Sequence, residues 1–100
     1  MIKKAPLRYT ATFYVEADSR EALEAAIEYV AKHVADGWVM YACGPYVCAC
    51  RAEIEWDGGR LTVRSCLKRT ARVVAKLLVE VYNWFGGKAI QVVKCENYKP

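Results

Sequence analysis

The feature that most constrains the fold is the turn sequence Asp-Gly-Gly at residues 57–59, which lies between two segments of alternating hydrophobicity. A two-residue hairpin loop of type I′ needs positive φ angles at both central positions, and glycine adopts them at little cost. The alternation then pairs Ile54 and Trp56 with Leu61 and Val63 on one face. The sequence therefore predicts a β-hairpin with an apolar inner face.

The opposite face of this hairpin is expected to carry paired charges. Glu53 and Glu55 alternate with the apolar residues, and Thr62 with either Arg60 or Arg64 would lie across from them. Opposite charges on neighbouring strands stabilise a sheet by roughly 0.2–1 kcal/mol per pair and help to fix the register.

The alternation continues upstream of the turn, so residues 46–56 are predicted to form one strand. Its inward side chains would be Tyr46, Cys48, Cys50, Ala52, Ile54 and Trp56. Residues 38–43 are also strand-like, and Gly44-Pro45 interrupts the two segments. Proline cannot donate to a sheet ladder, so this dipeptide is either a kink in one long strand or a turn between two short ones. The kink is the favoured interpretation.

The N-terminal third of the chain is predicted to form a strand and a helix. Residues 8–16 alternate, with Ala11, Phe13 and Val15 on one face. Asp18 followed by Glu21 matches a capping box, which predicts a helix that continues to about Ala35. Its core stripe has helical spacing and consists of Leu23, Ile27, Val30, Ala31 and Val34.

A second, weaker stripe on this helix is formed by Ala22, Ala25, Tyr29 and His33. It is interpreted either as a tolerant surface or as a second interface, for a partner protein or for another copy of the chain in a homodimer.

A second amphipathic helix is predicted from Ser65, a favourable N-cap residue, to Gly86-Gly87. Its apolar positions recur at intervals of three and four residues: Leu67, Ala71, Val74, Leu78, Val81 and Phe85. Residues 89–98 are predicted to form a final strand.

The predicted order is strand, helix, strand, strand, helix, strand. With right-handed crossovers, this order most simply gives an α+β fold, the ferredoxin-like βαββαβ plait. Its four-stranded antiparallel sheet carries two helices on one face. One hundred residues fit a single domain, 1–100. Residues 1–6 and 99–100 are expected to be mobile tails.

The composition indicates a globular protein without a membrane segment. The hydrophobic fraction of 55% supports a core, but no apolar run approaches the roughly 20 residues that span a bilayer. No apolar region follows Lys3 and Lys4, so no signal peptide is predicted. A cytoplasmic protein with reduced cysteines is therefore expected.

The strongest functional signal is a basic segment from residue 60 to residue 79, which contains no acidic residue. Its six cations are Arg60, Arg64, Lys68, Arg69, Arg72 and Lys76, whereas the net charge of the chain is +4. Several of them lie near the start of a predicted helix, where the helix dipole favours anions. An anionic partner would explain this placement, and so would pairing with the acidic first helix (Asp18, Glu21, Glu24 and Glu28).

The residues capable of metal binding or catalysis do not form a motif. Cys43, Cys48 and Cys50 have spacings that match none of the usual zinc patterns. A cysteine nucleophile needs a nearby histidine, and His33 is the single histidine of the chain. No catalytic residue, metal or cofactor is therefore predicted.

These observations predict a non-enzymatic interaction protein whose basic helix face binds a macromolecular partner with an acidic or phosphate-lined surface. The partner would be a protein or a nucleoprotein. Small, motif-poor proteins of this kind include phage-type inhibitors such as anti-CRISPR proteins, and such an inhibitor is one expectation. The alternative is direct binding of DNA or RNA as an accessory or regulatory protein. The third-strand glycine and aromatic signature of an RNA-recognition motif is missing.

Overall fold

The computed structural model describes residues 2–4, 7–36, 39–43, 46–50 and 52–95, and the side chains of residues 7–33 and 52–95. Its main sheet has four strands in the order β5-β6-β2-β7, and all neighbours are antiparallel. The strands are β2 (Tyr9–Ala17), β5 (Ala52–Trp56), β6 (Arg60–Ser65) and β7 (Ile90–Lys94). This is the strand order of the predicted ferredoxin-like plait, and the predicted fold class is confirmed.

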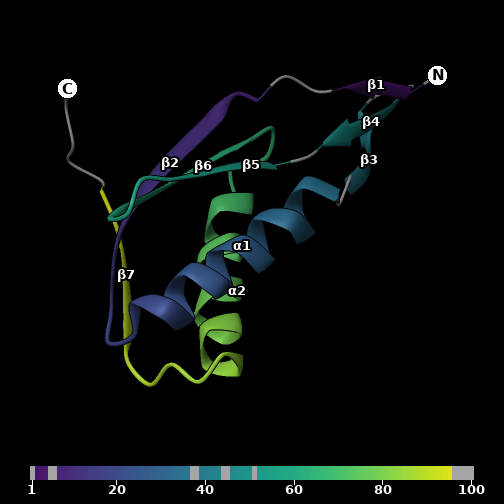
Figure 1. The fold of residues 1–100 in the computed structure, drawn as a ribbon. Helices are drawn as coiled ribbons and strands as arrows, with labels where there is room; N and C mark the ends of the chain where they lie inside the picture. The colour runs from purple at the N-terminus through teal and green to yellow at the C-terminus, as the bar shows by residue number, and fades with distance from the viewer. Residues whose placement is uncertain (1, 5–6, 37–38, 44–45, 51, 96–100) are drawn as a thin grey trace.

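Two helices, α1 (Arg20–Asp36) and α2 (Thr70–Trp84), lie on the same side of this sheet (Figure 1). Between the two layers is one apolar core. From the sheet it contains Phe13, Val15, Leu61 and Val63, and from the helices it contains Leu23, Ile27, Val30, Val74, Leu78 and Val81. The predicted facing of β2, β5 and β6 is therefore correct where side chains are described.

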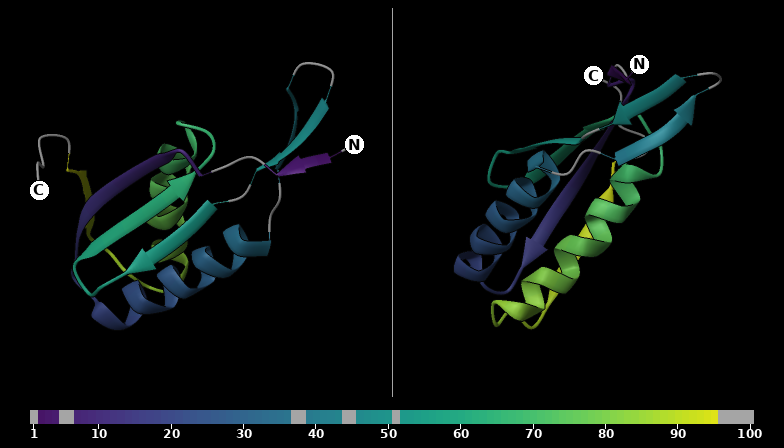
Figure 2. Two further views of the ribbon diagram at one scale, coloured as in Figure 1. Left: turned by 90° about the horizontal axis from the view of Figure 1, so that it is seen from above. Right: turned by 90° about the vertical axis from the view of Figure 1, so that its right-hand side faces the viewer.

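A second sheet of three strands was not predicted. It has the order β1-β4-β3 and is formed by β1 (Ile2–Lys4), β3 (Val39–Cys43) and β4 (Tyr46–Cys50). Figure 2 shows that it projects from one end of the molecule. The segment Ile2–Lys4, expected in a mobile tail, instead pairs in parallel with β4.

This small sheet corrects two predictions about residues 38–56. Val39–Cys43 pairs antiparallel with Tyr46–Cys50, with Cys43 opposite Tyr46. The chain therefore reverses between these strands, and the favoured kink is wrong, although Gly44-Pro45 itself lies outside the described residues. The single strand predicted for residues 46–56 is two strands in different sheets, because β4 pairs with β3 whereas β5 pairs with β6.

The hairpin between β5 and β6 has the predicted register, with Trp56 opposite Leu61. Its turn is of a different type, because Gly58 has a φ of 92° and Gly59 has no positive φ. A positive φ at the first central position alone is the pattern of a type II′ turn. The Asp57 carboxylate accepts hydrogen bonds from the backbone N–H groups of Arg60 and Gly59, and these bonds lower its pKa.

Both helices begin later than predicted. Ser19, and not Asp18, caps α1, because its Oγ accepts a hydrogen bond from Ala22 N at 3.2 Å. Ser65 is the buried last residue of β6, and its Oγ accepts a bond from Leu67 N at 3.2 Å. Because this bond closes a turn, α2 begins only at Thr70.

Asp18 instead links the start of α1 to the C-terminal end of α2 through hydrogen bonds. Its carboxylate accepts hydrogen bonds from the Tyr82 hydroxyl and from the N–H groups of Ala89 (3.1 Å) and Lys88 (3.3 Å). These bonds, first that of Tyr82, lower the pKa of Asp18. Burial, followed by the Asp18 bond, raises the pKa of Tyr82. The Tyr82 oxygen also accepts a bond from Ser19 N at 2.9 Å.

The end of α2 is a Schellman motif. Gly86 N donates to Asn83 O, Gly87 N donates to Tyr82 O, and Gly86 has a φ of 88°. The predicted stop at Gly86-Gly87 is thus confirmed. Phe85 was predicted to lie in the core, but it is 46% exposed, because Tyr82 occupies the buried position at this end of the helix.

The expected reduced state of the cysteines is wrong at Cys66, which is disulfide-bonded. Cys95 is a free thiol. Disulfides are typical of oxidising compartments, so the bond at Cys66 does not support the predicted cytoplasmic location. No helix in the described part of the chain is long and apolar enough to cross a membrane.

Candidate functional site

The six predicted cations do not form one surface. Arg60 and Arg64 belong to β6 and alternate with Leu61 and Val63, so they lie on the face of the sheet opposite the helices. Arg60 Nε is 3.3 Å from Asp57 Oδ2, and Arg64 Nη2 is 3.9 Å from the Glu55 carboxylate. These two arginines are thus compensated by acids of their own hairpin.

The other four cations lie together at and after the start of α2. Lys68 and Arg69 precede the first helical residue, Arg72 and Lys76 follow on the helix, and all four are exposed. No ion pair involves any of them within the side chains that the structure describes. This group is called the basic strip below.

The acidic first helix does not neutralise the basic strip. Glu24 pairs with Arg20 at 3.2 Å, and Glu28 approaches Lys32 at 4.0 Å, both on α1 itself. Asp18 is engaged by Tyr82 and the following loop. The start of α2 has neither a side-chain cap nor an acidic residue in its first turn. The charges of the strip therefore add to the positive end of the helix dipole.

Beside the basic strip is a cavity of about 500 Å³ between α2 and the sheet. Apolar side chains from both layers form much of its lining, among them Ala11, Phe13, Val63, Ala71, Ala75 and Val92. Half-buried Val79 also lines it. A concave apolar site of this volume is typical of ligand pockets, which measure roughly 300–1,000 Å³.

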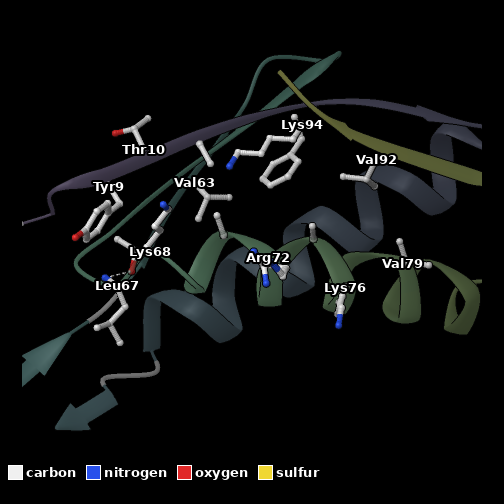
Figure 3. Close-up of a pocket in the computed structure, with 15 residues that line it drawn as sticks. Tyr9, Thr10, Val63, Leu67, Lys68, Arg72, Lys76, Val79, Val92 and Lys94 are labelled. Carbon is white, nitrogen blue, oxygen red and sulfur yellow. Dashed lines mark hydrogen bonds between the residues drawn. The ribbon is translucent and has the colours of Figure 1, made fainter. Parts of the chain in front are cut away.

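Among the described residues that line this cavity are four cations and no acidic residue. Three are predicted members of the basic strip, Lys68, Arg72 and Lys76, and the fourth is Lys94 of β7. In Figure 3 the amino groups of Lys68 and Lys94 point from opposite sides into the space between β2 and α2. The Lys76 amino group points away from the sheet. Arg69 does not line the cavity.

Lys94 was missed because it is 18 residues after Lys76, the last cation of the predicted basic segment. The pairing of β7 with β2, in which Lys94 lies opposite Phe13, brings it to the cavity. The sequence offered one indirect signal for Lys94. Residues 89–98 were predicted to form the final strand, and in a ferredoxin-like plait this strand pairs with the first one.

The open face of the sheet has a smaller hollow of about 220 Å³, lined by Thr12, Tyr14, Asp57, Arg60, Thr62 and Cys95. Tyr14 is 47% exposed there and would be available for stacking on a base. Arg60 is bound by Asp57. The open face therefore offers a weaker anion site than the basic strip.

The residues of the predicted second interface differ in exposure and do not form one exposed surface. Ala22 is buried in the core and Ala25 is half-buried, whereas Tyr29 is 44% exposed. The Tyr29 ring stacks on His33 and meets Trp84 and Phe85 edge-on, with centroid distances of 6.1–6.3 Å. An aromatic cluster between α1 and the end of α2 thus replaces the predicted alanine stripe as the exposed feature.

Within the described residues, no group of three or more His, Cys, Asp or Glu side chains is placed to hold a metal ion. The side chains of Cys43, Cys48 and Cys50 lie outside the description. Comparisons of the chain with protein-family models, with curated proteins and with solved structures give no match.

Proposed function

We propose that this protein is a non-enzymatic interaction module that binds an acidic macromolecular partner through the basic strip of α2. One observation carries the proposal: Lys68, Arg69, Arg72 and Lys76 are exposed and have no ion-pair partner among the described side chains. An array of one sign at the positive end of a helix attracts acidic groups and speeds association with them.

The surroundings of the strip favour a protein over a purely electrostatic partner. Val73 is 58% exposed on α2. Val79 of the same helix lines the cavity beside the strip. Protein interfaces combine an apolar centre with a charged rim. An acidic segment with one apolar residue would match both features.

The test is a charge reversal with a matched control. Arg69→Glu with Lys76→Glu changes the strip, whereas Arg20→Glu with Lys32→Glu makes the same change in net charge on α1. Partners are isolated from the native host and purified, and their affinities are then measured by calorimetry. We expect the strip variant to bind about ten- to a hundredfold more weakly and the control to bind as the wild type does. Equal binding by both variants would remove the strip from the interface.

Direct nucleic-acid binding is the second candidate, because phosphates would also be attracted by the unpaired cations of the strip. It is tested with labelled single- and double-stranded oligonucleotides at several salt concentrations. A steep fall in affinity with salt would support it, and absence of binding at low salt would exclude it. If the protein partner proves to be a nucleoprotein, inhibition of that complex would test the narrower prediction of an anti-CRISPR-type inhibitor.

A further inference from the structure

The cavity beside α2 is chemically divided into an apolar lining and a cationic mouth. Phe13 and Val63 are core residues of the sheet, and Ala71, Ala75 and Val92 pack partly buried against the same core. All five line the cavity. Apolar surface that stays in contact with water costs about 25 cal/mol per Å². A hydrocarbon group placed here would therefore be stabilised.

The mouth of the cavity has cations on two sides. Lys94 extends from β7 and Lys68 from the turn before α2, and Figure 3 shows both amino groups directed into the space between the layers. Arg72 also lines the cavity, from α2. Neither lysine has an ion-pair partner within the described side chains. Because both side chains are exposed, their flexible stems are able to adjust to a bound group.

We propose that this cavity binds an amphipathic anion, a single hydrocarbon chain with a carboxylate or phosphate head. The chain lies on Ala11, Ala75 and Val92, which line the cavity and are only partly buried. The head is bound by Lys68, Lys94 and Arg72. A guanidinium donates two parallel hydrogen bonds to either head group, and each lysine adds a charge-assisted bond. This site goes beyond the macromolecular partner proposed above. It shares Lys68 and Arg72 with the basic strip, whereas Lys94 belongs to the cavity alone and Arg69 to the strip alone, so variants of these two residues test the two proposals separately.

The proposal is tested by following the amide signals of the ¹⁵N-labelled protein during titration with defined probes. Octanoate and octyl phosphate carry both the chain and the head. Octan-1-ol lacks the charge, and butyrate lacks the chain. We expect saturable one-site binding of octanoate or octyl phosphate, with the largest shifts at Ala11, Val63, Ala75 and Val92. The tighter of the two identifies the head group. We expect octan-1-ol and butyrate to bind at least about tenfold more weakly, a difference of about 1.4 kcal/mol.

Two variants test the two halves of the site. Ala75→Leu places a larger side chain in the cavity, and Lys94→Gln removes one cation of the mouth. Each is expected to weaken octanoate binding about tenfold, whereas Lys88→Gln, an exposed lysine in the loop before β7, leaves it unchanged. If Ala75→Leu does not fold, Lys94→Gln and the comparison of probes still decide the outcome. Equal affinity for octanoate and octan-1-ol, or shifts confined to the Trp84 region, would overturn the proposal.

Discussion

Substitution of Gly87 by alanine is predicted to destabilise the protein strongly. A Cβ atom at this position would lie 2.5 Å from Tyr82 Cδ2 and closer still to two other atoms of the ring. The ring has no room to move away, because Tyr82 is fully buried and its hydroxyl is bound to Asp18 and Ser19. The backbone of Gly87 is itself held, since its N–H donates to Tyr82 O at 3.1 Å.

Overpacking of a fixed core site costs about 1–3 kcal/mol. For a domain of this size, a cost of about 2 kcal/mol corresponds to a fall in Tm of roughly 8–16 °C. Thermal unfolding followed by circular dichroism measures this fall.

Two other glycines provide matched controls for the same substitution. At Gly59 nothing lies within 4 Å of an added Cβ and the φ angle is not positive. Gly59→Ala should therefore be neutral or stabilising by about 0.4–1 kcal/mol. Gly86 has open space but a φ of 88°, so Gly86→Ala isolates the cost of the left-handed conformation, about 1–2 kcal/mol. If the Tm of Gly87→Ala lies within about 2 °C of that of the wild type, the Tyr82 ring is not fixed and moves to accept the added Cβ.

Three further predictions concern the same end of the molecule. The lowered pKa of Asp18 stabilises the folded state above the unfolded pKa, and this contribution is lost as the pH falls through the folded pKa. The Tm deficit of Asp18→Asn should therefore be full at pH 7 and shrink below about pH 4; a constant deficit would contradict this. The raised pKa of Tyr82 stabilises the folded state below the unfolded pKa, and this contribution is lost as the pH rises through the folded pKa. The Tm deficit of Tyr82→Phe should therefore be full at neutral pH and shrink above about pH 10. In urea unfolding, Leu78→Ala should cost about 2–5 kcal/mol because Leu78 is fully buried. Trp84→Ala should cost less than about 1 kcal/mol because Trp84 is 66% exposed; equal costs would show that Trp84 belongs to the core.

The main sheet was predictable because its signals are local. Alternation and a glycine turn specify the β5–β6 hairpin, and the observed pairing of Ile54 with Val63 follows from them. The division between β4 and β5 was not predictable, because residues 46–56 alternate without interruption. A period of two residues does not reveal that the chain passes from one sheet into another.

The helix starts depended on contacts that are distant in sequence. Asp18 and Ser19 are both favourable N-cap residues, and local sequence does not choose between them. Tyr82, which is 64 residues away in sequence, decides which of them caps α1. Its hydroxyl donates a hydrogen bond to the Asp18 carboxylate, and Ser19 caps the helix. The candidate site likewise combines a part that local sequence predicts with a part that depends on distant contacts. The basic strip was visible as a local run of cations, whereas Lys94 joins it only through the pairing of β7 with β2.

The position of the cavity also has a cause in the sequence. Ala71 and Ala75 are one helical turn apart on α2, and they line the cavity together with Ala11 of β2. The hydrophobic pattern assigned Ala71 to the core stripe with Val74 and Leu78, because periodicity registers which face a residue occupies and not its volume. Protein interiors are close-packed, so small side chains on both layers leave space where leucine or valine would fill it. These three alanines therefore account for a ligand-sized cavity at a position where the pattern alone predicts a filled core.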